Sequence, residues 1–203
     1  MTVQIDVWSD FVCPWCFLAS SSLEKLKQAY DVEIVWRSYE LRPKGSPPIP
    51  LEYLARIKAG QPRLVQMARD QYGLELSQGP MGISSRSALI GAKYAETQGK
   101  GAAYHDTMFR AYWQRANNIG DVDVLAEIAQ SIGLEHTAFL TALKDESYEA
   151  QVEADVELAY QYGLTGVPAL IFNNRYLVSG AQPFEVLQQV VEKVAADNAG
   201  ATR

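Results

Sequence analysis

The stretch Cys13-Pro14-Trp15-Cys16 holds both cysteines of this 203-residue chain. It follows an alternating apolar run, residues 3–8, that predicts a buried strand, and it precedes a helical pattern. Pro14 suits the first turn of that helix, because proline has no N–H to lose there and its φ is already helical. A C-x-x-C pair between a strand and a helix can open and close a disulfide, so the pattern indicates a redox site.

The positions of the two cysteines predict different roles. Cysteine attacks as its thiolate and titrates near pH ~8.5 when free, so a catalytic cysteine needs surroundings that acidify it. A helix N-terminus supplies unpaired N–H groups and the positive end of the helix dipole. Cys13 lies where these groups point, and Cys16 is one turn further and is expected to be less exposed. We therefore predict that Cys13 attacks and that Cys16 resolves the intermediate.

Half of a zinc site is the alternative reading of the cysteine pair. Structural zinc usually has four ligands, from two C-x-x-C pairs or from one pair and two closely spaced histidines. This chain has only His105 and His136, which lie far apart. The ligand count favours redox chemistry. We predict no metal and no other cofactor, and we assign neither histidine a catalytic role.

Composition narrows the class of protein. The length and a hydrophobic fraction of 48% fit one compact domain that carries an insertion. A net charge of −6 disfavours nucleic acid and anionic membrane as partners. The first residues lack the pattern of a signal peptide, and no run of about 18 apolar residues occurs. We predict a cytoplasmic location, where close cysteines are more often catalytic or metal-binding than structural.

Periodicity along the chain predicts an α/β protein. A second strand is expected over 32–41, and residues 51–143 show helical periodicity with breaks. Two apolar runs, 169–172 and 176–178, flank Asn173-Asn174-Arg175 and predict a hairpin, because asparagine tolerates the left-handed positions of tight turns. A last helix opens near Gln182. The expected order is β-α-β, a helical block, and α-β-β-α.

Pro168 is the second informative position. It lies between a predicted helix end and a predicted strand start, and proline belongs at the first residue of a strand or in a turn. A cis Val167–Pro168 bond would expose the backbone of Val167 for pairing with an extended peptide. Only about 5–6% of X–Pro bonds are cis, so the local sequence leaves both isomers open.

Four separated motifs resemble the DsbA-like thioredoxin family, and most closely its cytoplasmic FrnE branch. In order they are Ser9-Asp10-Phe11-Val12-Cys13-Pro14-Trp15-Cys16, Arg37-Ser38-Tyr39-Glu40-Leu41, Gly166-Val167-Pro168 and Ser179-Gly180-Ala181-Gln182-Pro183. The resemblance implies a thioredoxin fold with an all-helical insertion domain. Residues 1–48 and 149–203 would form the thioredoxin-like domain, and residues 49–148 the insertion. It also implies a cis bond at Val167–Pro168, in a loop that faces the cysteines.

The same resemblance implies a thiol–disulfide oxidoreductase that acts on protein thiols or disulfides. Glutathione or a thioredoxin-type reductant would be its redox partner. Pro14, Trp15, Val167 and Pro168 would contact the substrate, with Trp15 as a flat surface for an unfolded peptide. The alternative for Trp15 is that it only caps a neighbouring apolar patch.

Two departures from the family pattern bear on the chemistry. Thioredoxins and periplasmic DsbA commonly carry a buried carboxylate six residues before the first cysteine, where this chain has Val7. Asp6 should point to the other face of the strand. Either Glu40, Asp10 or a water takes that role, or the proton acceptor is absent. Trp15 stands in place of the histidine of periplasmic DsbA and adds no charge. We therefore predict a potential between about −270 and about −120 mV, the values of thioredoxin and DsbA.

Two other functions fit the sequence. The architecture also resembles 2-hydroxychromene-2-carboxylate isomerases and kappa-class glutathione transferases, which use a serine near the position of Cys13 to activate glutathione. The intact C-x-x-C pair argues against that chemistry. The second alternative is a non-catalytic peptide-binding or chaperone-like module that uses the surface near Trp15 and Pro168.

Overall fold

The computed structural model describes residues 2–200, so Met1 and residues 201–203, which the predicted thioredoxin-like domain includes, lie outside the described residues. The chain divides into two compact units, one formed by Met1–Tyr39 with Glu153–Arg203 and the other by Glu40–Val152. The prediction of an α/β thioredoxin fold with a helical insertion is confirmed.

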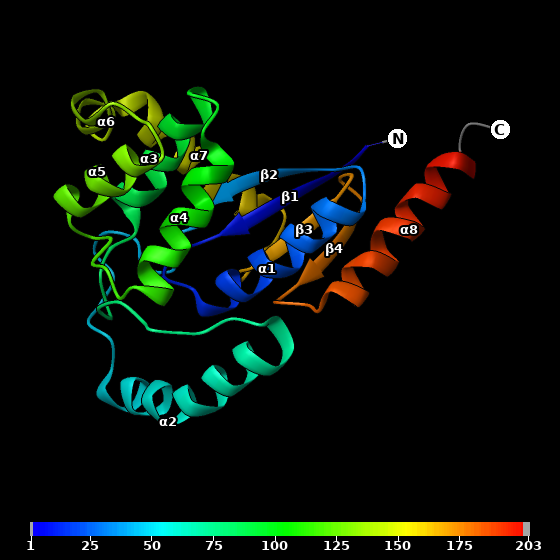
Figure 1. Cartoon of the computed structure of the whole chain (residues 1–203), viewed down its shortest axis with the longest axis horizontal. Helices are drawn as coiled ribbons and strands as arrows, with labels where there is room; N and C mark the ends of the chain where they lie inside the picture. The colour runs from blue at the N-terminus through cyan, green and yellow to red at the C-terminus, as the bar shows by residue number, and fades with distance from the viewer. Residues whose placement is uncertain (1, 201–203) are drawn as a thin grey trace. The chain divides into compact units, whose positions relative to one another are not determined.

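The first unit is built on a four-stranded sheet. Its complete elements are β1 (Val3–Ser9), α1 (Pro14–Ala29), β2 (Val32–Ser38), β3 (Ala169–Phe172), β4 (Tyr176–Ser179) and α8 (Phe184–Gly200), shown in Figure 1. The strand order is β2-β1-β3-β4. β1 and β2 run parallel, joined through α1, whereas β3 runs antiparallel to both β1 and β4. β2 ends three residues before the predicted Leu41.

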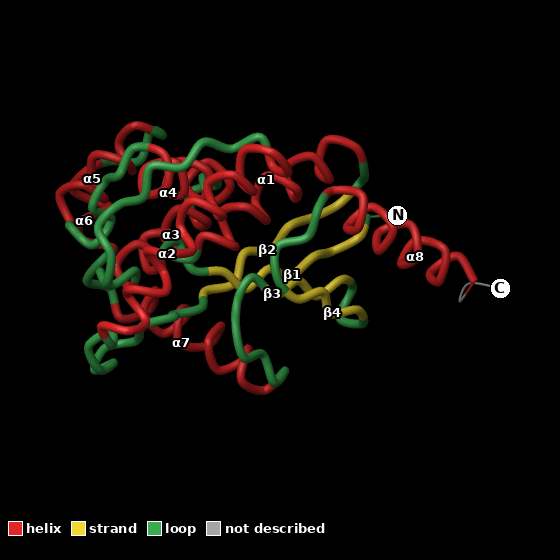
Figure 2. Tube along the Cα trace, turned by 90° about the horizontal axis from the view of Figure 1, so that it is seen from below, coloured by secondary structure: helices red, strands yellow, loops and turns green. Residues whose placement is uncertain are grey.

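Strand alternation in β1 divides its side chains between two faces. On one face the apolar residues of β1 pack against α1 and α8, in a cluster that includes Val3, Ile5, Val7, Leu23, Leu26, Leu187, Val191 and Val194. On the other face Trp8 packs with Ala159, from the end of α7 (Glu146–Gln161), and with Leu164. Figure 2 shows α1 and the end of α7 on opposite sides of the strands.

The predicted hairpin is present between β3 and β4. Asn173 and Asn174 have φ of 45° and 54°, the left-handed region that asparagine enters more readily than most residues. Asn173 also exchanges hydrogen bonds with Gln4 of β1: its N–H donates to the Gln4 carbonyl at 2.9 Å, and its side-chain oxygen accepts from the Gln4 N–H at 2.8 Å. The turn therefore fixes the register of β3 against β1.

The second unit is helical. It contains α2 (Leu51–Met67), a π-helical turn η1 (Ala68–Tyr72), α3 (Arg86–Thr97), α4 (Gly101–Gln114), α5 (Val122–Ser131), α6 (His136–Ala142) and the first turns of α7. Its core joins α3, α4 and α6, where the rings of Tyr104 and Phe139 lie 6.0 Å apart. α2 differs from the other helices, because none of its residues is fully buried.

The two units divide at other residues than the predicted boundaries after 48 and 148. The first division follows Tyr39, and Glu40 already belongs to the second unit, where its buried carboxylate pairs with Arg86 of α3 at 2.8 Å. The second division follows Val152, within α7. The predicted boundary after 48 lies in the loop before α2, and the one after 148 lies within α7, four residues before the division.

Candidate active site

Cys13 occupies the N-cap of α1. Its backbone is extended, with φ −90° and ψ 118°, and Pro14 takes the first helical position as predicted. No side chain caps this helix, so its first N–H groups remain directed at the N-cap. The loop before the helix is closed by a hydrogen bond of 3.0 Å from the Cys13 N–H to the Asp10 carbonyl. The sequence thus places a sulfur at the positive end of a helix.

The cis-proline segment lies next to Cys13. The Cys13 thiol donates to the Val167 carbonyl at 3.5 Å, although 154 positions separate the two residues. The Val167–Pro168 bond is cis, as the resemblance implied. The Pro168 carbonyl accepts a hydrogen bond of 2.8 Å from the Gly180 N–H, which ties the segment to the end of β4. Cys13 therefore lies against Val167, the residue that forms the cis bond with Pro168.

Both cysteines are free thiols, and both are buried. Cys13 and Cys16 keep 3% and 2% of their surface exposed, so the expected difference in exposure is very small. Pro14 is half-buried and Pro168 buried, whereas Trp15 is 43% exposed. The tryptophan thus presents an apolar surface to solvent between two sheltered sulfurs.

The surroundings of Cys16 make its thiolate costly. Burial raises the pKa of the Cys16 thiol, and the neighbouring Cys13 raises it further. Two groups act in the opposite direction: a hydrogen bond from the Asp10 backbone and the side chain of Ser9 both lower this pKa. Among the described residues, no carboxylate contributes to the shift. Ser9 was not anticipated from the sequence, because a serine at the end of a strand has no distinguishing pattern.

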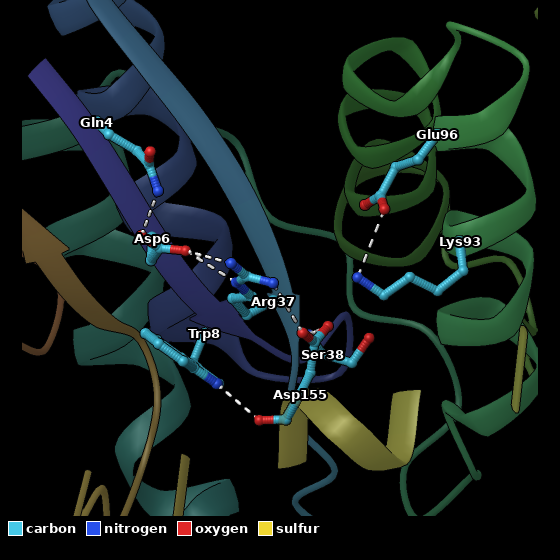
Figure 3. A network of polar contacts seen from close by, with 8 residues as sticks. All are labelled: Gln4, Asp6, Trp8, Arg37, Ser38, Lys93, Glu96 and Asp155. Carbon is cyan, nitrogen blue, oxygen red and sulfur yellow. Dashed lines mark hydrogen bonds and ion pairs between the residues drawn. The ribbon is translucent and has the colours of Figure 1, made fainter. Parts of the chain in front are cut away.

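The Asp6 carboxylate, next to Val7 in β1, is bound on the other face of the sheet. Val7 is buried in the sheet core, and Asp6 points to the other face, as predicted. Figure 3 shows Asp6 bound to Arg37 of β2, with 2.8 Å between the Asp6 carboxylate and the guanidinium. Arg37 also pairs with Asp155 of α7 at 3.3 Å, and Asp155 accepts the Ser38 N–H at 2.8 Å. This network fastens α7 to the sheet.

The histidines lie in the helical unit, His105 buried in α4 and His136 exposed at the start of α6. Within residues 2–200, no group of three or more histidine, cysteine or acidic side chains is arranged to hold a metal ion. In the same part of the chain, no helix is both long and apolar enough to cross a membrane.

Comparisons with known proteins agree with this geometry. The family model of the DSBA-like thioredoxin domain matches residues 4–192. YwbO of Bacillus subtilis (strain 168) is 31% identical over 195 residues, which cover 94% of this chain and 96% of YwbO. The 2-hydroxychromene-2-carboxylate isomerase of Pseudomonas putida is 23% identical over 206 residues, covering 96% and 97% of the two chains.

Solved structures share the fold. The probable DsbA oxidoreductase SCO1869 from Streptomyces coelicolor has a TM-score of 0.84 and 29% identity, covering 96% of this chain and 90% of its own. The cytosolic disulfide reductase DsbM from Pseudomonas aeruginosa, in a structure with GSH, has a TM-score of 0.71 and 19% identity, covering 95% and 99%. Because the family model spans nearly all of the sequence, the chain belongs to the DsbA-like thioredoxin family.

Proposed function

We propose that this protein is a thiol–disulfide oxidoreductase that acts on protein thiols or disulfides through Cys13 and Cys16. The observation that carries the proposal is the position of the Cys13 sulfur, at the N-terminus of α1 and 3.5 Å from the Val167 carbonyl. A helix N-terminus favours a thiolate, and a backbone group beside it can hold an extended peptide. Family membership supports the reaction class. The assignment to the FrnE branch stays a prediction.

Reduction of a substrate would proceed in two exchanges. The Cys13 thiolate attacks one sulfur of the substrate disulfide, forms a mixed disulfide and releases the other sulfur as a thiolate. Cys16 then loses its proton and attacks the Cys13 sulfur. The Cys13–Cys16 bond forms, and the second substrate sulfur leaves and takes a proton. The reverse sequence oxidises a substrate dithiol, so the potential of the redox partner sets the direction.

The residues around the sulfurs would receive the substrate. The exposed ring of Trp15, with the half-buried Pro14 beside it, offers an apolar surface to an unfolded chain. The backbone of Val167, held by Pro168, would pair with the peptide on the other side. We propose a cytoplasmic location, where reduction or isomerisation is easier to sustain than net oxidation. Glutathione or a thioredoxin-type protein would then restore the dithiol, and the DsbM structure with GSH makes glutathione the first to test.

Insulin reduction in a titrated redox buffer tests this proposal. The unmodified protein is expected to catalyse the reaction, and Cys13→Ser to abolish it because the attacking sulfur is lost. Cys16→Ser should still attack but stop at the mixed disulfide, which gel electrophoresis without reductant detects. Turnover that survives Cys13→Ser would contradict the proposal.

The isomerase relative favours a second candidate, a glutathione-dependent isomerase or transferase. That chemistry needs one activating group and no resolving sulfur. Assay of the unmodified protein and of Cys16→Ser with 2-hydroxychromene-2-carboxylate and glutathione separates the two functions. An isomerase should turn over this substrate in both forms, whereas a dithiol reductase should turn it over in neither. If the protein is instead a peptide-binding module without catalysis, the Cys13→Ser/Cys16→Ser variant should protect an unfolded substrate as well as the unmodified protein does.

A further inference from the structure

The buried Cys16 thiol poses a problem that the proposed function does not solve. It must lose a proton before it can attack, yet burial and the neighbouring Cys13 both raise its pKa. Val7 occupies the position where a carboxylate would be expected, and the nearby Asp6 is engaged by Arg37 on the other face of the sheet. Something other than a carboxylate in these positions must stabilise the thiolate while it exists.

Ser9 is a buried hydroxyl in the right place. It is the last residue of β1, 3% exposed, and its backbone carbonyl accepts the Tyr39 N–H at 3.0 Å. Its Oγ is fully buried and has no hydrogen-bond partner among the described residues while both cysteines are thiols. A buried donor without a partner is uncommon, because burial removes its hydrogen bonds to water and no protein hydrogen bond compensates for that loss.

The loop between β1 and α1 brings this hydroxyl to the resolving cysteine. The hydrogen bond from the Cys13 N–H to the Asp10 carbonyl turns the chain back at the end of the strand. Ser9 and the Asp10 backbone consequently lie beside the first turn of α1, which carries Cys16, and both favour its charged form. Neither the Ser9 hydroxyl nor the Asp10 N–H is a base, so neither would take up the proton that Cys16 releases.

We propose that the Ser9 hydroxyl and the Asp10 backbone N–H form a two-donor cradle for the Cys16 thiolate, in place of the missing carboxylate. The proposal rests on the dithiol mechanism above. The Cys16 proton passes to the substrate thiolate released in the first exchange. The Ser9 hydroxyl then donates to the charged sulfur until that sulfur bonds to Cys13 and the second substrate thiolate departs. Ser9 thus acts on a reacting atom, without itself gaining or losing a proton.

The decisive variant is Ser9→Ala, which removes one donor and leaves the backbone donor in place. A hydrogen bond to a charged group is worth about tenfold or more in an equilibrium. A thiolate of higher pKa is also the stronger nucleophile, so the release of substrate from the mixed disulfide should slow by roughly three- to tenfold at neutral pH. Its pH profile should move to higher pH. The rate at which Cys13 first attacks should not change, because that step does not use Cys16.

Two further variants separate a chemical role from a structural one. Ser9→Thr keeps the hydroxyl and should restore most of the rate. Ser38→Ala is the matched control, because Ser38 is the register partner of Ser9 on β2 and is equally buried at 3%; its release rate should equal that of the unmodified protein. Urea unfolding establishes that each variant is folded.

A direct titration distinguishes failure of this proposal from failure of the proposed function. In Cys13→Ser the absorbance of the thiolate near the ultraviolet edge reports Cys16 alone. Adding Ser9→Ala should raise the pKa of Cys16, and Ser38→Ala should leave it in place. An unchanged Cys16 titration, or equal slowing by Ser38→Ala, would overturn the cradle. Normal titration shifts in a protein without disulfide exchange would instead overturn the proposed function.

Discussion

At the scale of single residues, Trp15 places a neutral side chain, and no charge, beside the attacking sulfur of Cys13. Its side chain is neutral and 43% exposed, so the helix N-terminus is left as the source of positive potential at Cys13. Stabilising the thiolate of the reduced form makes a dithiol centre more oxidising. The neutral ring should therefore hold the centre at a moderate potential.

The potential of the Cys13–Cys16 pair gives a first prediction. In a glutathione equilibrium the unmodified protein should lie between about −270 and about −120 mV. Trp15→His places an ionisable ring beside Cys13 and should make the potential less negative. Trp15→Phe keeps an uncharged aromatic ring and serves as the control, with little change expected. A value at or above about −120 mV for the unmodified protein would refute the interpretation.

At the scale of elements, the helical unit depends on a close approach between α3 and its neighbours. Gly91 of α3 faces the rings of Tyr104 and Phe139, and a Cβ at this position would lie 2.8 Å from Cζ of Phe139 and closer still to the Tyr104 hydroxyl. Both rings are fully buried, so neither can turn away into solvent. Glycine is thus required here for space.

Gly91→Ala should therefore destabilise the helical unit by about 1–3 kcal/mol, the usual cost of overpacking a core. Gly60→Ala in α2 is a matched control, because a Cβ there meets nothing within 4 Å. Alanine is the better helix former, so the control should stabilise by about 0.5–1 kcal/mol. Urea unfolding followed by circular dichroism measures both changes, and equal effects at the two positions would contradict the packing argument.

At the scale of the whole molecule, stability should depend on pH through His105. Burial, with the charge of Lys93 as the smaller cause, lowers the pKa of His105 to about 3. An unfolded histidine titrates near about 6.5. Below that value the unfolded chain binds a proton that the folded chain excludes, so acid favours unfolding.

His105→Leu should flatten this dependence. In the unmodified protein the histidine contributes a loss of up to about 1.4 kcal/mol of unfolding free energy per pH unit as the pH falls below about 6.5. Removing the ring removes that slope, whereas His136→Leu, at an exposed position, should keep it. Urea midpoints between pH 7 and 4.5 measure the difference. Parallel curves for the unmodified protein and His105→Leu would show that His105 is not the cause.

The order of elements was predictable because local patterns determine it. The alternation in β1, the proline at the start of α1 and the asparagines of the hairpin each act within a few residues. The meeting of Cys13 with Val167 spans 154 positions, and the pairing of Glu40 with Arg86 spans 46. No local pattern encodes either contact. The first contact was expected only from resemblance to a family, and the second joins two residues of the helical unit, Glu40 and Arg86.

The site was predictable to the same extent. The cysteines could be identified from their type and spacing, and Pro168 from the family motif; the sequence alone identifies these residues. It does not identify Ser9, because the importance of Ser9 comes from a missing partner for its hydroxyl, which only three-dimensional packing reveals. At Val7 the sequence lacks the carboxylate of the family pattern, which left open whether another group takes its role and did not point to Ser9.

The burial of both sulfurs also limits which molecules can form a disulfide with this protein. Covalent dimers form when a thiol of one molecule touches a thiol of another, and two recessed atoms cannot touch across flat surfaces. With Cys13 and Cys16 exposed by only 3% and 2%, a second folded copy is a poor partner for cross-linking. A slender, protruding or unravelled segment is a good one. The depth of the sulfurs should therefore disfavour disulfide cross-links between folded copies and favour reaction with extended chains.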